Sequence, residues 1–174
     1  MKSSLGTDFM KRSLARERVY LDANVYIYAD LAIDKLGADA RQMMAALLDR
    51  KFTAGTCCLT VDEVLWSIWL HADRDRAVRV ARAMLSMPSL EIFELSRDHM
   101  RAAVENVEIH GLRPRDAIHL ASMSANDMKT IVTEDMDFDK IPKIKRLGIS
   151  EFVKGLNTDL KGIETGPKRS MRKT

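Results

Sequence analysis

The chain has 174 residues, a net charge of +3, 46% hydrophobic residues and 30% charged residues. This length suits one domain with a full hydrophobic core, and the composition is that of an ordinary soluble globular protein. No apolar run approaches the roughly 20 residues of a membrane helix, and no apolar segment follows the basic N-terminus, so we expect neither a membrane span nor a secretory signal.

Hydrophobic periodicity predicts strands and helices that alternate along the chain. In chain order we expect a strand at 19–21, a short helix to residue 29, helices at 39–50, from residue 60 and at 74–87, a strand at 90–95, helices at 96–110 and from residue 114, and strands at 130–133 and 147–152. Gly55 is expected to end the second of these helices. Ser96 and Gly111 are expected to cap one later helix, and Pro114 to begin the next. Strands separated by helices predict an α/β sandwich on a mostly parallel sheet.

Charge is unevenly distributed along the chain. Residues 1–18 carry five Lys or Arg against two acids, residues 161–174 carry five against one, and the segment between them is therefore acidic. We expect flexible basic tails at 1–18 and 156–174 around a folded domain at 19–155, because both ends are poor in large apolar residues. A basic tail can attract nucleic acid, and it can equally be a solubilising end.

The two cysteines, Cys57 and Cys58, are adjacent in the sequence. This spacing suits neither a disulfide nor a metal site. We expect buried free thiols, which indicates a reducing, cytoplasmic location.

Four carboxylates stand at strand ends or helix starts. Asp22 ends the first strand within VYLDANVYIY, and Asp135 lies just past the strand IVT. Glu63 lies in the first turn of the helix opened by Thr60, and Asp116 in the first turn of the helix opened by RPRD. In an α/β sheet, such places can converge at the carboxyl ends of the strands.

Each carboxylate also has a purely structural explanation. Thr60 and Glu63 match a capping box, and Asp116 gains from the helix dipole without any ligand. Asp135 could be a turn residue, whereas Asp22 has the weakest such explanation because no turn glycine accompanies it. Four carboxylates gathered together would repel one another by roughly several kcal/mol, so a shared site implies hard cations.

Four motifs occur in a fixed order along the chain: LDANV with Asp22 and Asn24, TVDEVLW with Glu63, RPRDAIHLASM with Asp116, and IVTEDMDFD with Asp135. Together they resemble the PIN domain family, the metal-dependent nuclease fold that includes VapC-type toxins. The resemblance covers about residues 19–152.

The resemblance implies a three-layer α/β/α sandwich whose four acids, Asp22, Glu63, Asp116 and Asp135, bind Mg²⁺ or Mn²⁺ and cleave RNA phosphodiesters. For the fourth acid, Asp135 fits the family pattern best, and Asp137 is close enough to assist. It also implies a homodimer and, for toxin members, an antitoxin partner that covers the acidic site.

The residue types suit this chemistry. Carboxylates are the ligands that hard Mg²⁺ prefers, and the ion lowers the pKa of its bound water and accepts phosphate oxygens. A zinc site would need a cluster of His and Cys that the sequence lacks. Asn24 and Thr133 would orient a ligand or a water. Arg113 and Arg115 could bind RNA phosphates, or could simply be solvated residues at a helix start.

Three further residues each have two interpretations. His119 lies one helical turn after Asp116 and could face the site, although we favour a core-edge histidine with one satisfied nitrogen. Trp66 and Trp69 lie three residues apart on one helix and could stack on bases, but burial against the sheet or a dimer partner is favoured.

The sequence therefore predicts a metal-dependent endoribonuclease of PIN type, a candidate toxin of a toxin–antitoxin pair. The alternative is a PIN-like module that binds RNA or a partner without cleavage, to which four repelling carboxylates would give no advantage. A phosphatase or response-receiver fold with Asp22 as nucleophile is a third interpretation, disfavoured because LDANVYIY lacks the D-x-D pattern.

Overall fold

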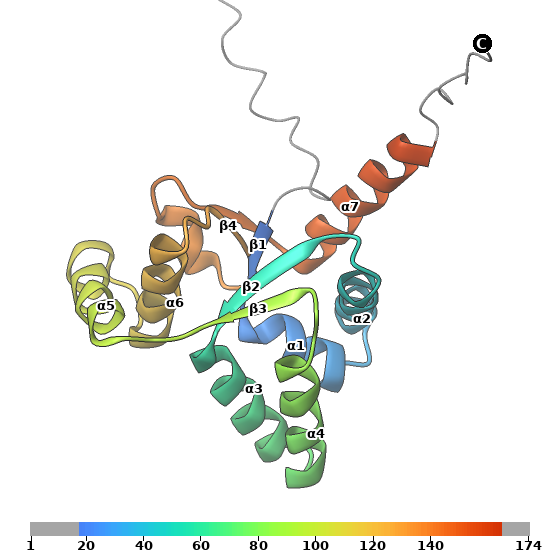
Figure 1. Ribbon diagram of the computed structural model, residues 1–174, viewed down its shortest axis with the longest axis horizontal. Helices are drawn as coiled ribbons and strands as arrows, with labels where there is room; N and C mark the ends of the chain where they lie inside the picture. The colour runs from blue at the N-terminus through green and yellow to red at the C-terminus, as the bar shows by residue number, and fades with distance from the viewer. Residues whose placement is uncertain (1–17, 165–174) are drawn as a thin grey trace, which may run out of the picture.

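A five-stranded, wholly parallel sheet forms the centre of the structure (Figure 1). The computed structural model describes residues 18–164, with side chains up to residue 159. The strands lie in the order β3-β2-β1-β4-β5, and their bounds are β1 (Arg18–Leu21), β2 (Thr53–Cys57), β3 (Leu90–Phe93), β4 (Thr130–Val132) and β5 (Lys145–Leu147). Tyr20 of β1 pairs with Gly55 of β2 on one side and with Ile131 of β4 on the other.

Helices cover both faces of this sheet. They are α1 (Ala23–Leu31), α2 (Lys35–Leu48), α3 (Cys58–His71), α4 (Arg74–Leu85), α5 (Arg97–His110), α6 (Pro114–Ala125) and α7 (Ile149–Glu164), with a short 3₁₀ helix η3 (Met136–Lys140). One core contains side chains of α1, α2, α3, α4 and α7, and the other contains those of α5 and α6. Figure 1 shows α5 and α6 on one side of the strands and α2 and α7 on the other. The predicted three-layer α/β/α sandwich is confirmed.

The side chains of β1 alternate between the two cores. Val19 and Leu21 lie in the core that contains α1, whereas Tyr20 lies in the core that contains α6, and all three are fully buried. Successive residues of a strand point to opposite faces, so a strand with helices on both faces needs a continuous apolar run. The run VYL meets that need.

The strand order fixes the place of the site. β2 and β3 lie on one side of β1, and β4 and β5 lie on the other. In open α/β sheets, ligands bind outside the carboxyl ends of the strands at such a switch point. Asp22 follows β1 directly at this point, and its backbone N–H donates to the carbonyl oxygen of Val132 at 3.2 Å.

The helix caps predicted from the sequence are confirmed. The Ser96 side chain caps α5, and Gly111 ends that helix with a left-handed φ of 62°. Pro114 is the first residue of α6, where its missing N–H would have no helical partner in any case.

Two elements differ from the predicted ones. Gly55, expected to end a helix, lies inside β2, whose sequence TAGTC has only small residues and no strong apolar signal. Residues 147–152, expected to form a strand, hold the end of β5 and the start of α7. The backbone N–H of Ile149 donates to Oε1 of Glu134 at 2.7 Å, which satisfies one of the amides left open at the start of a helix.

The last helix extends past the predicted limit of the domain. The boundary expected at residue 155 falls inside α7, which runs to Glu164 and places Phe152 and Leu156 in the core. Residues 1–17 and 165–174, assigned to the basic tails, lie outside the described residues. Across residues 18–164, none of the helices combines the length and apolar character needed to cross a membrane.

The two cysteines are both free thiols, but they differ in exposure. Cys57 is buried in the core that contains α6, as expected, whereas Cys58 is exposed at the start of α3. The expectation of two buried thiols is therefore wrong for Cys58, because the first turn of α3 directs its side chain away from the core.

Replacement of Gly55 by Ala should destabilise the fold. A Cβ at this position would lie 2.6 Å from two ring carbons of Phe93 and 3.0 Å from the sulfur of Met128, so buried side chains would have to move. We expect Gly55→Ala to lower the free energy of unfolding by about 1–3 kcal/mol, measured by urea unfolding. Gly148→Ala is the matched control, because its nearest contact would be a Glu134 carboxylate oxygen at 3.4 Å. Equal losses in the two variants would contradict the packing explanation.

Candidate functional site

The carboxyl edge of the sheet carries acidic side chains that come from separate elements. The four predicted acids are Asp22 between β1 and α1, Glu63 on α3, Asp116 on α6, and Asp135 between β4 and η3. Carboxylate oxygens of Asp116, Asp135 and Asp137 lie within 4.8 Å of one another. Ligand atoms of Asp22, Glu63 and His119 form a second group and also lie within 4.8 Å of one another. The structure thus brings the predicted acids to one edge of the sheet.

Asp22 is held through both of its oxygens. Its Oδ1 accepts from the backbone N–H of Ala23 at 2.6 Å and so caps α1. Its Oδ2 accepts from the Thr133 hydroxyl at 2.6 Å and from the Asn24 amide at 2.7 Å. The Thr133 hydroxyl oxygen in turn accepts from the Asn24 amide at 2.7 Å and from the backbone N–H of Asp135 at 3.0 Å. Asn24 and Thr133, two of the three predicted supporting residues, therefore contact Asp22, and Thr133 links it to the segment that carries Asp135.

Glu63 points into the site and does not cap its helix. α3 begins at Cys58, so Glu63 lies beyond its first turn, and the Thr60 hydroxyl lies 2.7 Å from the Thr56 hydroxyl. The capping-box explanation for Glu63 is therefore wrong. Its carboxylate instead lies 2.9 Å from Nε2 of His119 and 3.7 Å from a guanidinium nitrogen of Arg115.

Asp135 and Asp137 lie on a tight turn that follows β4. Asp135 caps η3, because its Oδ1 accepts from the backbone N–H of Asp137 at 2.8 Å. Asp137 also pairs with Lys140, whose Nζ lies 3.1 Å from its Oδ1. The turn explanation for Asp135 thus holds locally, and the same turn directs its carboxylate towards Asp116.

Burial and mutual repulsion oppose ionisation of these acids. Burial raises the pKa of Asp22, although His119 and Thr133 act against the rise. Burial and the negative charges of Asp135 and Asp22 raise the pKa of Asp116 to about 6. Because Asp116 interacts with acids of both groups, the two groups form one continuous negative site.

Basic residues stand around the edge of this site. Arg113 and Arg115, the predicted RNA-binding candidates, are both exposed where α6 begins. Arg115 reaches Glu63, and the charge of Arg113 lowers the pKa of Asp116 slightly against the stronger opposing effects of burial and neighbouring acids. The edge of the site is therefore positive where its centre is negative.

His119 is a buried member of the site, and its interpretation as a core-edge residue with one satisfied nitrogen is wrong. Only 1% of the residue is exposed, and both ring nitrogens have partners. Nε2 contacts Glu63, and Nδ1 lies 2.9 Å from the Tyr20 hydroxyl and 3.6 Å from the Cys57 sulfur. The one sequence signal for this role is the three-residue spacing from Asp116, which places both side chains on one side of α6.

A family profile described as the PIN domain matches residues 19–144, a span that contains all four predicted acids. This chain belongs to the PIN domain family. Curated proteins similar to this PIN domain include VapC ribonuclease Mb1869c of Mycobacterium bovis and ribonuclease VapC13 of Mycobacterium tuberculosis. Each is 28% identical over 135 residues, which cover 74% of this chain and 98% of the relative.

Solved structures share the PIN fold. Mycobacterium tuberculosis VapC20, described as a sarcin-ricin loop cleaving toxin, superposes with a TM-score of 0.60 at 18% identity and covers 70% of this chain and 92% of its own. DNA-bound VapBC from Salmonella typhimurium gives a TM-score of 0.58 at 15% identity, with 76% and 98% covered. At these identities the likeness establishes the fold of the PIN domain and nothing finer.

Neutralising Asp116 should stabilise the metal-free PIN domain. Its pKa is raised from 3.8 to about 6 in the folded chain, so ionisation costs folding free energy. This cost grows as the pH rises from 3.8, where the unfolded chain ionises, and is complete above about 6, where the folded chain is ionised as well. We expect Asp116→Asn to raise the free energy of unfolding by about 1 kcal/mol at pH 7.5 in EDTA, after allowance for solvent screening. The melting temperature should rise by about 2–4 °C.

The matched control is Asp62→Asn, which removes the same charge from an exposed position on α3. The difference in stability between Asp116→Asn and the parent should be smaller at pH 5, where Asp116 of the folded parent is mostly protonated. Scanning calorimetry at the two pH values measures this difference. An Asp116→Asn variant that melts below the parent at pH 7.5 would contradict the repulsion described above.

Proposed function

We propose that this PIN domain is an endoribonuclease that requires Mg²⁺ or Mn²⁺, held by Asp22, Glu63, Asp116 and Asp135. One observation supports the metal above all: Oδ2 of Asp116 is buried and has no hydrogen-bond partner among the described residues. Buried acceptors in native proteins nearly always have partners, so this oxygen requires an explanation. A cation shared with the neighbouring carboxylates would satisfy it.

The donor set suits a hard cation. The four acids offer carboxylate oxygens, and Oδ1 of Asn24 is another buried oxygen that lacks a hydrogen-bond partner in the described part of the chain. Mg²⁺ and Mn²⁺ are bound by such oxygen ligands. Asp135 is favoured over Asp137 as the fourth acid because Asp137 is already paired with Lys140, and Asp137 would assist.

The residues of the chain would orient the reaction. When bound, the ion would supply an activated water and neutralise the charge that develops on the phosphate. Asn24 and Thr133 fix the carboxylate of Asp22 in one orientation. Arg113 and Arg115, exposed at the edge, would bind phosphates of the RNA backbone, because guanidinium groups pair well with phosphate.

Two other functions suit the site less well. A module that only binds RNA or a partner gains nothing from acids whose repulsion and burial raise the pKa of Asp116 to about 6. A nucleophilic Asp22 would need an uncommitted oxygen, whereas both of its oxygens accept hydrogen bonds. The names of the curated relatives, both ribonucleases, also favour RNA hydrolysis.

Cleavage should depend on both the metal and Asp116. We expect the parent chain to cleave a fluorogenic RNA in Mn²⁺ and to lose this activity in EDTA, and Asp116→Asn to reduce the rate by about 100-fold or more. Asp62→Asn is the control for loss of one negative charge and should cleave at the parent rate. RNA binding that is independent of metal and accompanied by no cleavage would support the binding module in place of the nuclease.

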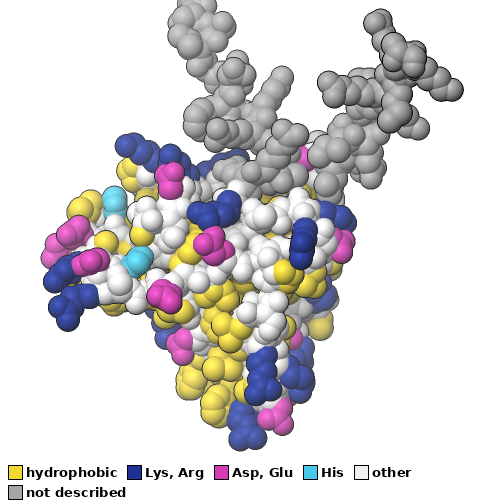
Figure 2. Space-filling model, viewed as in Figure 1, with side chains coloured by type: hydrophobic (Ala, Val, Ile, Leu, Met, Phe, Trp, Pro, Cys, Tyr) yellow, Lys and Arg dark blue, Asp and Glu magenta, His cyan; other side chains and the backbone are white. Residues whose placement is uncertain are grey.

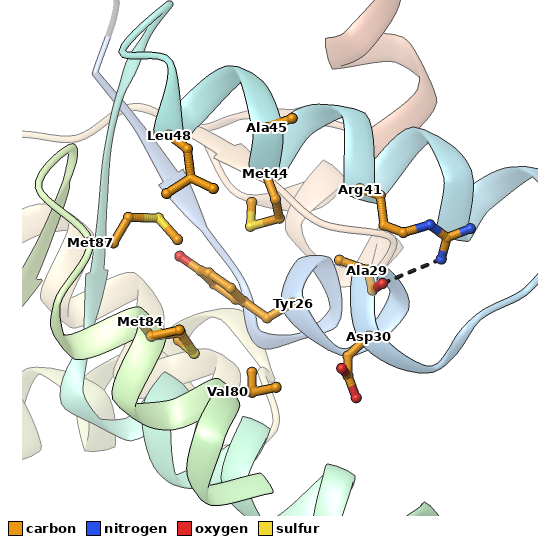
Figure 3. Close-up of a pocket in the computed structure, with 11 residues that line it drawn as sticks. Tyr26, Ala29, Asp30, Arg41, Met44, Ala45, Leu48, Val80, Met84 and Met87 are labelled. Atoms are coloured by element: carbon orange, nitrogen blue, oxygen red, sulfur yellow. Dashed lines mark hydrogen bonds between the residues drawn. The ribbon is translucent and has the colours of Figure 1, made fainter. Parts of the chain in front are cut away.

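We also propose that the chain binds an antitoxin. One of the similar solved structures is a toxin–antitoxin complex from Klebsiella pneumoniae. This chain has an open groove of about 350 Å³ between α1, α2 and α4, with apolar side chains on its walls: Tyr26, Met44, Leu48, Val80, Met84 and Met87 (Figure 3). Figure 3 shows the Tyr26 hydroxyl pointing into this groove, and it has no hydrogen-bond partner among the described residues. An amphipathic helix that lays its apolar face against these walls would fit the groove.

A charge placed in the groove should prevent this docking. Met44→Glu puts a carboxylate among apolar walls, so a VapB-type antitoxin that binds the parent chain should bind the variant at least about 10-fold more weakly, as measured by calorimetry. Gln42→Glu adds the same group to α2 outside the groove and should leave binding unchanged. Equal binding to both variants would place the antitoxin elsewhere.

The homodimer and the cytoplasmic location stay predictions. Trp66 and Trp69 on α3 are 58% and 52% exposed, so the expected burial against the sheet is wrong. A partner surface and the stacking of RNA bases are the two explanations that stay open. Figure 2 shows hydrophobic side chains gathered over the part of the molecule where α3 lies. Light scattering of the chain in solution tests the homodimer, which should have twice the mass of one chain.

A further inference from the structure

The imidazole of His119 lies behind the acidic site, where four elements meet. The ring belongs to α6 and contacts Glu63 of α3, Tyr20 of β1 and Cys57 of β2. Its side chain is 2% exposed, so very little of the ring is open to solvent. A group buried this deeply against two acids must have its protons in defined places.

The partners of His119 determine which nitrogen carries hydrogen. A carboxylate oxygen accepts hydrogen bonds, so Nε2, at 2.9 Å from Oε2 of Glu63, donates. Burial raises the pKa of Tyr20 to about 12, so the hydroxyl beside Nδ1 keeps its proton. That hydroxyl donates to Nδ1 of a neutral ring and accepts from Nδ1 of a charged ring. The Nε2–H group is therefore directed at Glu63 in both states.

This hydrogen bond decides how Glu63 faces the site. With Oε2 bound to His119, the other oxygen, Oε1, lies 3.7 Å from the exposed guanidinium of Arg115. Three rotatable bonds would otherwise let the carboxylate turn away from Asp22. Nε2 also lies 3.8 Å from Oδ1 of Asp22, so one donor faces two acids that are only 12% and 14% exposed.

A direct bond from His119 to a metal is the competing arrangement. Nε2 does lie within 4.8 Å of ligand oxygens of Asp22 and Glu63. Ligation would require Nε2 to lose its hydrogen and its short contact with Glu63, and Mg²⁺ prefers oxygen ligands. The observed contacts favour a histidine that orients a ligand over a histidine that is one.

We propose that His119 is a positioning residue, whose Nε2–H holds Oε2 of Glu63 and so fixes the carboxylate in its place beside Asp22, within reach of a shared metal. The proposal rests on the proposed function, in which Glu63 is a metal ligand. Tyr20 supports the arrangement from the other side of the ring, because its hydroxyl fixes the plane of the imidazole.

Two replacements of His119 test this role, with Mn²⁺ alone as the probe and the full chain as the protein. Gln can place an amide N–H near the position of Nε2, whereas Leu fills similar space without a donor. We expect His119→Leu to weaken Mn²⁺ binding about 10- to 100-fold and His119→Gln to recover most of that loss, as measured by calorimetry. Ser122→Ala, which alters a buried hydroxyl further along α6, should bind Mn²⁺ as the parent does. Parent-like affinity in His119→Leu would overturn the proposal.

A measurement on the parent chain avoids any dependence on how the variants fold. Nitrogen-15 NMR of the His119 ring should show a hydrogen on Nε2 before and after saturation with Mg²⁺. Disappearance of that hydrogen on addition of Mg²⁺ would show direct ligation and overturn the positioning role.

Glu63→Gln separates this proposal from the proposed function. If Glu63→Gln leaves both Mn²⁺ binding and RNA cleavage unchanged, Glu63 is not a ligand and the proposed site itself is wrong. If Glu63→Gln abolishes both while His119→Leu changes neither, the nuclease site stands and only the role of His119 is overturned.

Discussion

Negative charge held at the end of β1 is the constraint on which the rest of the site depends. Asp22 can stand there because one of its oxygens caps α1 and the other accepts from Asn24 and Thr133. The remaining acids come to the same place from other elements of the fold. The packing of the whole domain therefore holds them together against their mutual repulsion. Part of the cost falls on Asp116, where burial and its neighbours hinder ionisation.

Positive and donor groups are arranged around this charge in two layers. Beneath the acids lies His119, buried and rigidly bonded on both ring nitrogens. Around the outside lie Arg115 and Lys140, both largely exposed, which pair with Glu63 and Asp137. The buried donors fix the orientation of the carboxylates. The exposed cations can leave these carboxylates and pair with another anion. An approaching RNA backbone would therefore meet cations before it meets the acids.

The sequence predicts well what is decided by neighbours along the chain. Asp22 is recognisable because a carboxylate after an apolar strand is costly, and the caps at Ser96 and Gly111 follow from local geometry. What depends on distant partners is hidden: Gly55 lies in a strand because it pairs with Tyr20 and Glu91, and it is a glycine because the Phe93 ring packs where a Cβ would be. His119 is harder still, since its partners Glu63 and Tyr20 are 56 and 99 positions away.

The pairing of β1 with β4 has a consequence for the order in which the site forms during synthesis of the chain. Asp22 and Thr133 share a hydrogen bond across 111 positions of sequence, and Asp135 follows directly after. A polypeptide still being translated has made Asp22 long before it has made these residues, so it exposes one isolated aspartate and no pocket. In the proposed function, the metal site would be complete only after residues 133–135 have been made, and shorter fragments would have no nuclease activity.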